Sequence, residues 1–227
     1  MKNQTINVSY KDVLKSDYKI LIEQSEDYVR YAMLGDIKEA YKMLRDEVSA
    51  KNPRNMFEYI ECVEQVIIHY FGNYANAKNR MNNYPKGDMG GKVSNLYHKN
   101  TAFGIERAML AQNLLWEVGV DSVFKISDTI INDEVISHGY NIIDQVDKQY
   151  IFDATFPTEK KNRISPLVCE IPREVYNQMI STNIGCSVHV NHLNPLDCNE
   201  YDITYDAGRE DYYEGDKSFT KKLVLDD

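Results

Sequence analysis

The sequence predicts an α+β fold, because helical and extended patterns occupy separate parts of the chain. Apolar residues recur every three or four positions from about residue 25 to residue 84, and again from 102 to 118, which is typical of amphipathic helices. After Gly119 the pattern changes to extended segments rich in Val, Ile, Tyr and Phe. This order predicts a helix packed on an antiparallel sheet, with further helices before it.

The N-terminal part is expected to form a helical hairpin. Its first helix is predicted over residues 25–48, with a break near Gly35, from apolar residues at helical spacing: Val29, Ala32, Met33, Ile37, Ala40 and Leu44. Asn52-Pro53 then interrupts the pattern, since proline lacks an amide donor and biases the residue before it away from helix. The helical pattern restarts over residues 56–81.

A concentration of turn-forming residues marks a boundary near residue 91: Pro85, Gly87, Gly90 and Gly91. We therefore divide the chain into an N-terminal helical region (1–91), a core (92–207) and a polar C-terminal tail (208–227). The first helix of the core is rich in Ile, Leu, Met and Val and also contains Trp116, which predicts that this helix is buried. We expect Asn100 or Thr101 to cap it and Gly119 to end it.

Three extended segments follow this helix, over residues 120–128, 134–146 and 148–156. Asp147-Lys148 is a polar pair suited to a tight turn, so the last two segments are predicted to form a hairpin. Beyond them the sequence predicts a short helix near residues 172–179 and strands near 186–190 and 200–205.

Composition narrows the classes of function. The chain has 227 residues and a net charge of −9, from 35 acidic and 26 basic residues, which disfavours binding to nucleic acid. It contains no apolar run of the length of a signal peptide's core or a membrane span, so we expect no membrane association and a cytoplasmic location. Four sparse cysteines do not resemble a disulfide framework and are expected to be reduced.

The core helix and the hairpin together carry a chemically meaningful arrangement. Thiol-dependent acyl transfer needs a thiolate, a histidine that passes protons and an acid that orients the imidazole. A helix N-terminus lowers the pKa of a thiol, and Gly104 lies in the first turn of the predicted helix. His138 opens one strand of the hairpin and Asp153 closes the other. Asp153 is therefore expected to bind one ring nitrogen of His138 and to leave the other facing position 104.

These segments resemble the transglutaminase-like superfamily, within the papain-like fold, over residues 92–156 and towards Tyr205. The matching features are Gly104-Ile105-Glu106-Arg107-Ala108, Gly119, His138-Gly139-Tyr140-Asn141 and Tyr150-Ile151-Phe152-Asp153-Ala154-Thr155. In that family Cys-x-x-x-Ala starts the helix, a glycine ends it, a histidine followed by an aromatic residue starts a strand, and Asp-x-Thr ends the next. The resemblance implies a papain-like or transglutaminase-like core, catalytic positions at 104, 138 and 153, no cofactor, and a protein or peptide as substrate or partner.

The sequence departs from this family at the nucleophile, because Gly104 occupies the cysteine position. No Cys, Ser or Thr lies within two residues of it, and Thr101, the nearest hydroxyl, belongs to the capping turn. Loss of such a nucleophile typically costs on the order of 10⁶ in turnover. We therefore expect a vestigial site in a non-catalytic binding or regulatory protein, a pseudoenzyme.

Several alternatives stay open from the sequence. The chain is also consistent with a cysteine-dependent protease, amidase or transglutaminase represented by a variant that lacks its nucleophile. His138 and Asp153 are otherwise explained as a pair that stabilises the hairpin, and the helical region as a protein-interaction module. The sequence does not determine the oligomeric state.

Two further groups of residues have both a structural and a functional interpretation. Glu106 and Arg107 are interpreted as a first-turn acid favoured by the helix dipole and a solvated or ion-paired base. Cys186, His189, His192 and Cys198 are all of zinc-ligand type, but their spacing matches no standard finger, and we expect unrelated core and surface residues rather than a metal site.

Overall fold

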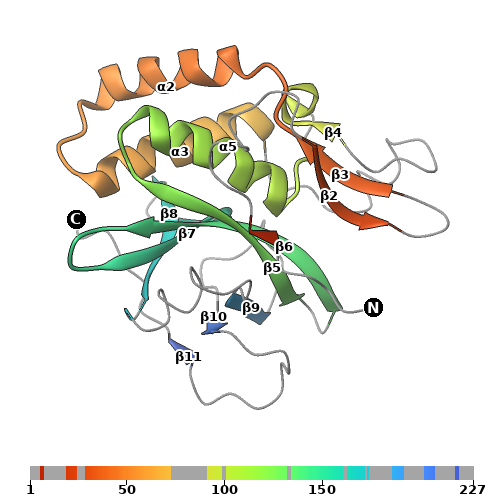
Figure 1. The fold of residues 1–227 in the computed structure, drawn as a ribbon. Helices are drawn as coiled ribbons and strands as arrows, with labels where there is room; N and C mark the ends of the chain where they lie inside the picture. The colour runs from red at the N-terminus through yellow and green to blue at the C-terminus, as the bar shows by residue number, and fades with distance from the viewer. Residues whose placement is uncertain are drawn as a thin grey trace.

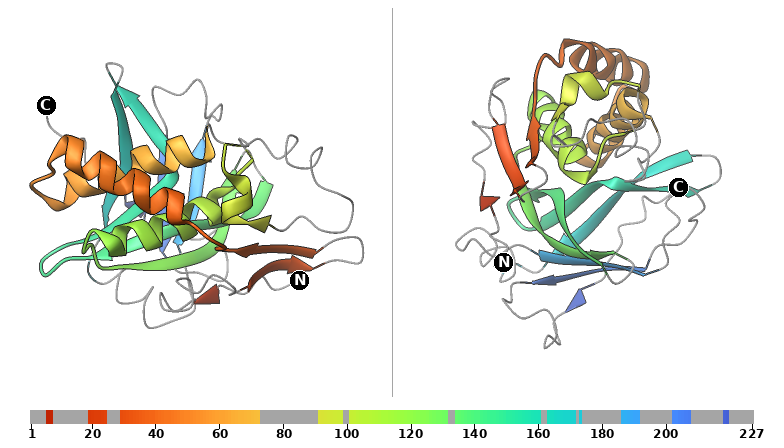
Figure 2. Two further views of the ribbon diagram at one scale, coloured as in Figure 1. Left: turned by 90° about the horizontal axis from the view of Figure 1, so that it is seen from above. Right: turned by 90° about the vertical axis from the view of Figure 1, so that its right-hand side faces the viewer.

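The fold is α+β, with helices on one side of a large twisted sheet (Figure 1). The computed structural model describes residues 6–7, 19–24, 29–72, 91–98, 101–131, 134–160, 163–171, 173, 186–191, 202–207 and 218–219. The helices are α2 (Lys38–Lys51), α3 (Met56–Phe71) and α5 (Gly104–Glu117), with a 3-10 turn η1 (Val93–Leu96). Helix α5 lies next to the sheet, and α2 and α3 pack against it and each other, as the end-on view in Figure 2 shows.

The large sheet has eight strands in the order β11-β10-β9-β5-β6-β7-β8, with β1 paired to β5. Its strands are β1 (Ile6–Asn7), β5 (Ser122–Ile131), β6 (Glu134–Asp144), β7 (Gln149–Lys160), β8 (Arg163–Ile171), β9 (Cys186–Asn191), β10 (Asp202–Ala207) and β11 (Ser218–Phe219). Strands β5 to β8 run antiparallel to their neighbours, whereas β9 pairs with β5 in parallel. The predicted helix on an antiparallel sheet is therefore present, with β5, β6 and β7 contacting α5.

The predicted helical hairpin is confirmed over α2 and α3, but its first helix begins later than expected. Residues 29–33 form strand β3 (Val29–Met33), which pairs with β2 (Lys19–Gln24) and with β4 (Gly91–Lys92) in a second sheet. The prediction of helix was wrong at residues 29–33, because a short apolar segment fits either periodicity and one of its two strand partners, β4, lies far along the chain. Gly35, with φ at +71°, separates the strand from α2.

Local sequence signals account for the ends of α3. The Asn55 side chain accepts a hydrogen bond from the amide of Glu58 at 3.0 Å, which satisfies a first-turn donor. The helix ends at Gly72, whose φ of +77° suits glycine. The helical pattern predicted beyond this residue lies outside the described residues.

Helix α5 is buried from Gly104 to Leu115, as predicted, although Trp116 near its end is 50% exposed. Gly119 ends it with a φ of +77°, also as predicted. Of the two residues expected to cap it, Asn100 lies outside the described residues, and Thr101 does not act as a cap. The Oγ1 atom of Thr101 has no hydrogen-bond partner among the described residues, and the amide of Phe103 donates to Oε2 of Glu106 at 2.9 Å instead. Glu106, the third residue of the helix, thus accepts a hydrogen bond from the Phe103 amide, which has no partner within the helix.

The hairpin of β6 and β7 turns at Val146 and Asp147, one residue earlier than predicted. Gln145 and Lys148 exchange backbone hydrogen bonds of 2.8 and 3.3 Å across this two-residue turn. The predicted strands near residues 186–190 and 200–205 are present as β9 and β10. The predicted helix at 172–179 and most of the tail after 207 lie outside the described residues. No helix in the described ranges is long and apolar enough to cross a membrane.

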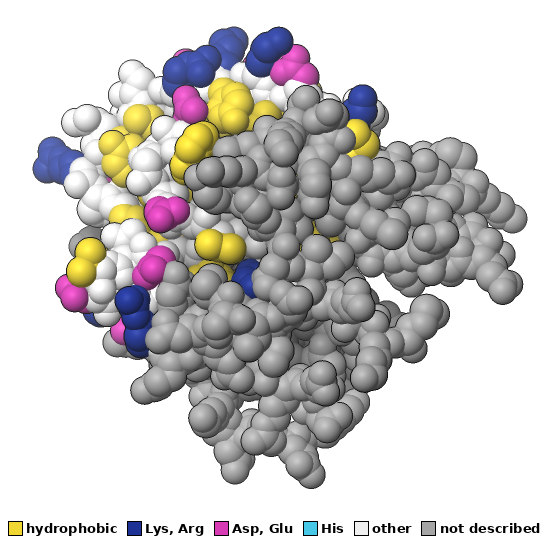
Figure 3. Space-filling model, in the orientation of Figure 1, with side chains coloured by type: hydrophobic (Ala, Val, Ile, Leu, Met, Phe, Trp, Pro, Cys, Tyr) yellow, Lys and Arg dark blue, Asp and Glu magenta, His cyan; other side chains and the backbone are white. Residues whose placement is uncertain are grey.

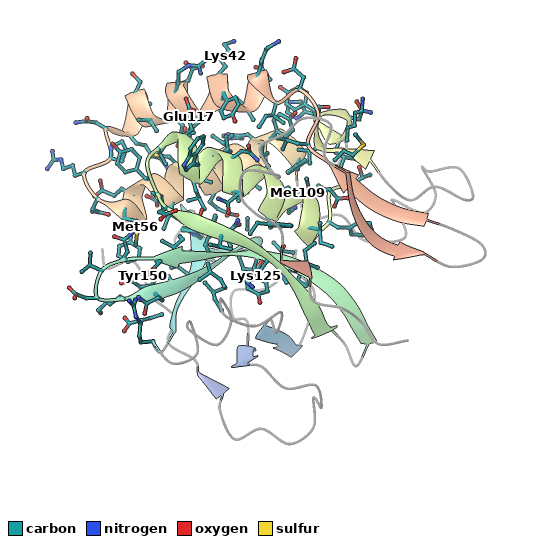
Figure 4. The ribbon with its side chains drawn as sticks, viewed as in Figure 1. Lys42, Met56, Met109, Glu117, Lys125 and Tyr150 are labelled. Carbon is teal, nitrogen blue, oxygen red and sulfur yellow. The ribbon has the colours of Figure 1, made fainter. Side chains whose placement is uncertain are left out.

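The two faces of the large sheet have different surroundings. Phe124 and Ile126 of β5 belong to the core shared with the helices, whereas Lys125 between them points to the other face, as Figure 4 shows. Met109 of α5 lies on the helix side of the sheet in the same view. On the face drawn in Figure 3, basic and acidic side chains are interspersed over α2, with no block of one sign among the described atoms.

Helix α5 crosses strand β6 at a point where their backbones nearly touch. A Cβ atom added to Gly139 would lie 2.7 Å from the Cα atom of Ile105, closer than real Cβ contacts come. Only a glycine on the strand allows this approach.

We expect Gly139→Ala to lower the free energy of unfolding by about 1–3 kcal/mol, the usual cost of overpacking a core. Most of that cost should persist in an Ile105→Ala background, because the obstacle is the backbone Cα of residue 105. Urea denaturation of the native protein, the two single variants and the double variant measures both effects. A neutral Gly139→Ala, or full relief by Ile105→Ala, would contradict the proposed close contact.

Candidate functional site

His138 and Asp153 form a buried pair across the β6–β7 hairpin. The Nε2 atom of His138 lies 2.7 Å from Oδ2 of Asp153, and their side chains are 2% and 0% exposed. The hairpin register, in which Asn141 lies opposite Phe152 and Ile142 opposite Ile151, brings the two positions onto neighbouring strands. The pairing expected from the sequence is therefore present, although both residues lie within their strands rather than at the predicted ends, since β6 begins at Glu134 and β7 continues to Lys160.

The Asp153 carboxylate is held by its own strand as well as by the imidazole. Its Oδ1 atom accepts a hydrogen bond from the amide of Thr155 at 3.0 Å, so its two oxygens have separate partners. The His138 ring also lies beside Tyr140, with ring centroids 6.4 Å apart and planes inclined by 27°. These contacts fix the orientation of the imidazole, which is the role of the acid in a proton-passing pair.

The Nδ1 edge of the imidazole lies against Gly104, the first residue of α5. A Cβ atom at position 104 would lie 2.6 Å from Nδ1 and 2.7 Å from Cε1 of His138, and 2.9 Å from Oγ1 of Thr155. One ring nitrogen thus binds Asp153 and the other faces position 104, as predicted. The contact is so close that a side chain at 104 requires its neighbours to move.

The helix N-terminus is therefore enclosed rather than open. Gly104, His138, Asp153 and Thr155 are all buried, and the orphan amide of Phe103 already has Glu106 as its acceptor. A His–Asp pair passes protons, but acyl transfer also needs an attacking atom, and glycine supplies none.

Two hydroxyl groups near this point have no hydrogen-bond partner among the described residues. They are Oγ1 of Thr101 and Oγ1 of Thr155, on side chains that are 3% and 0% exposed. Thr101 precedes the helix. The Thr155 hydroxyl is one of the three atoms nearest to a Cβ at position 104, whereas the Thr101 hydroxyl is not. Thr155 was not singled out by sequence reasoning, although it is the threonine of the Asp-x-Thr pattern.

Glu106 and Arg107 are both buried, so the base at 107 is not solvated, contrary to one of the two expectations for it. The Arg107 guanidinium donates from Nη2 to the carbonyl of Gly72 at 2.8 Å and from Nε to the carbonyl of Ala102 at 3.4 Å. It also lies 5.5 Å from the centre of the Phe71 ring. Arg107 thus joins the end of α3 to the start of α5, a role that its position in the sequence did not reveal.

A buried amide network fastens α5 to the sheet behind the site. Asn141 donates from Nδ2 to the carbonyl of Ala108 and to Oε1 of Gln112, both at 3.2 Å. Gln112 donates in turn to the carbonyl of Ser122 at 2.9 Å. The sequence contained no signal for this network beyond two amide side chains in apolar surroundings.

The cysteine and histidine residues considered as metal ligands are not assembled in the part of the chain that the structure describes. Cys186 and His189 lie on β9, while His192 and Cys198 lie outside the described residues. Within the described ranges there is no group of three or more metal-binding side chains.

The close contact at position 104 leads to a stability prediction. Gly104→Ala should lower the free energy of unfolding by about 1–3 kcal/mol, because the overpacking cost outweighs the gain of about 1 kcal/mol from the better helix propensity of alanine. His138→Ala should relieve most of this cost, since the obstacle is a side chain. A double-mutant cycle by urea denaturation measures the coupling, and additive effects would refute the contact. The Gly139→Ala cycle, where the obstacle is backbone, is the matched control.

The chain matches no model of a protein family and no curated protein. The case for a function therefore rests on the geometry at Gly104, His138 and Asp153.

Proposed function

We propose that this chain is a non-catalytic, transglutaminase-like protein that acts by binding or regulating a protein or peptide. The observation that carries the proposal is the His138 imidazole, paired with Asp153 at 2.7 Å and turned with its other nitrogen toward a glycine at the helix N-terminus. This is the arrangement of a thiol acyl-transfer site from which the thiol is missing.

The surrounding fold supports a papain-like or transglutaminase-like core. Helix α5 begins at position 104 and packs on β5, β6 and β7, and the histidine and the aspartate follow in that order on β6 and β7. This order of helix, histidine strand and aspartate strand agrees with the sequence resemblance. Fold and activity are nevertheless separate matters, because activity depends on the atoms at the site.

The filled space at position 104 favours a non-catalytic protein over an enzyme from which a cysteine was lost. In the second candidate, the same His–Asp pair belongs to a cysteine-dependent protease, amidase or transglutaminase whose nucleophile is absent from this variant. The presence of the His138–Asp153 pair is consistent with this second candidate. A site adapted to a cysteine, however, leaves room for its Cβ, whereas here that position is 2.6 Å from His138 Nδ1.

The protein should show no amide hydrolysis or transamidation above the uncatalysed rate. Removal of a triad nucleophile typically costs on the order of 10⁶ in turnover, which leaves no measurable rate with ordinary substrates. Release of ammonia from glutamine-containing peptides, and cleavage of a casein substrate, measure the two reactions. Activity that disappears in His138→Ala would show that the chain is an enzyme and would refute the proposal.

Gly104→Cys tests whether the site is related to that of thiol enzymes. If positions 104, 138 and 153 are those of a thiol enzyme, the new thiol should react with iodoacetamide at least tenfold faster than Cys62, because the helix N-terminus and the imidazole favour the thiolate. Cys62 is the internal reference, because it is fully buried and burial raises the pKa of its thiol. Mass spectrometry of the peptides gives the rate at each cysteine.

The matched control is Gly104→Cys combined with His138→Ala, in which the enhanced reactivity should be lost. Circular dichroism confirms that each variant is folded before its thiols are compared. A folded Gly104→Cys protein whose new thiol is no more reactive than Cys62, or whose reactivity does not depend on His138, would leave a purely structural pair and refute the relation to thiol enzymes.

A further inference from the structure

Glu64 is a buried acid for which the site described above has no use. It lies on α3, where the charges of Arg107 on α5 and Asp153 on β7 act on it, and its side chain is 0% exposed. Neither Oε1 nor Oε2 has a hydrogen-bond partner among the described residues. A buried carboxylate without partners is among the most costly groups in a protein interior.

Arg107 is the positive charge that offsets a negative charge on Glu64, and the two are not hydrogen-bonded to each other. Arg107 of α5 attracts the Glu64 carboxylate, but its guanidinium is hydrogen-bonded to the carbonyls of Gly72 and Ala102. Asp153 of β7 acts in the opposite direction, because it is a second acid in the same region. Burial is the largest effect, and with Asp153 it raises the pKa of Glu64 well above its ordinary value against the attraction of Arg107.

Other charged side chains on the elements around α3 have different neighbours. On β8, Glu170 is paired with Lys148 at 3.0 Å, and on α2, Glu47 is paired with Lys51 at 2.9 Å. Glu61, one turn earlier on α3 itself, is buried and has interactions of its own. None of these is hydrogen-bonded to Glu64, whose surroundings thus favour the neutral acid.

We propose that Glu64 is held as a protonated acid between α3 and α5, and that its ionisation loosens the packing of α5, the helix that begins at Gly104. The fold thereby carries a pH-sensitive element next to the His138–Asp153 pair. This proposal concerns packing and charge alone, so it does not rest on the proposed function and its failure leaves that function untouched.

The direction of the pH dependence follows from proton binding. Glu64 has a higher pKa in the folded protein than in the unfolded chain, where it is near 4.5. Below that pH both states are protonated and the contribution to stability is complete. As the pH rises from there toward the folded pKa, unfolding releases one proton, and the unfolding equilibrium constant rises about tenfold per pH unit.

Glu64→Gln tests the proposal, because glutamine keeps the shape of the neutral acid and cannot ionise. The ratio of the unfolding constants of the native protein and Glu64→Gln should rise about tenfold per pH unit above about 4.5. Urea denaturation from pH 4 to pH 8 gives both constants. Glu39→Gln, at an exposed position on α2, is the control and should keep the native pH dependence.

A constant ratio across this pH range would overturn the proposal, because it would mean that Glu64 ionises equally in both states. Failure of Glu64→Gln to fold would also overturn it, since a neutral side chain of the same shape should be tolerated. A second measurement uses the native protein alone. Infrared difference spectra between pH values should show the carbonyl band of a protonated carboxylic acid at a pH where exposed glutamates are ionised, and its absence would refute the assignment.

Hydrogen exchange tests the coupling to α5. Amides of residues 104–117 should exchange faster in the native protein than in Glu64→Gln at the same pH, and the difference should grow as the pH rises. Equal exchange in the two folded proteins throughout would show that Glu64 ionises without loosening the helix, contrary to the proposal.

Discussion

The burial of helix α5 is the constraint on which the rest of the structure depends. From Gly104 to Leu115 the helix has no exposed residue, so its polar groups depend on partners inside the protein rather than on water. Glu106 therefore binds the amide of Phe103, Arg107 binds two backbone carbonyls, and Gln112 binds Asn141 and Ser122. The same side chains that satisfy this requirement also tie α5 to α3 and to the sheet.

Close packing on the sheet explains why glycine occurs at both contacts between the helix start and the hairpin. Gly139 allows the backbone of β6 to approach Ile105, and Gly104 allows the imidazole of His138 to lie on the first turn of α5. A Cβ atom added at either glycine would lie 2.6 or 2.7 Å from its nearest neighbouring atom, which is closer than real Cβ contacts. The space beside the His138 imidazole, where the proposed relation to thiol enzymes would require a nucleophile, is thus filled by packing, and the His–Asp pair is buried in the core.

Much of this arrangement was predictable because it depends on local patterns. Apolar residues at helical spacing located α3 and α5, Gly119 marked the end of α5, and the alternating segments around residues 134–156 predicted the hairpin. The pairing of His138 with Asp153 followed from the hairpin, since neighbouring antiparallel strands bring such positions together. The segment at 29–33 failed the same reasoning, because a short apolar segment fits either periodicity, and its pairing with the neighbouring segment 19–24 and the distant segment 91–92 makes it a strand.

The sequence by itself determined the fold class, the order of the site residues and the absence of a thiol at position 104. Only the tertiary structure decided that this position is filled, that Arg107 is buried, and that Glu64 is buried without a hydrogen-bond partner among the described residues. The physical reason is that periodicity reports which face of an element is apolar. The distance between side chains on different elements depends on how those elements pack.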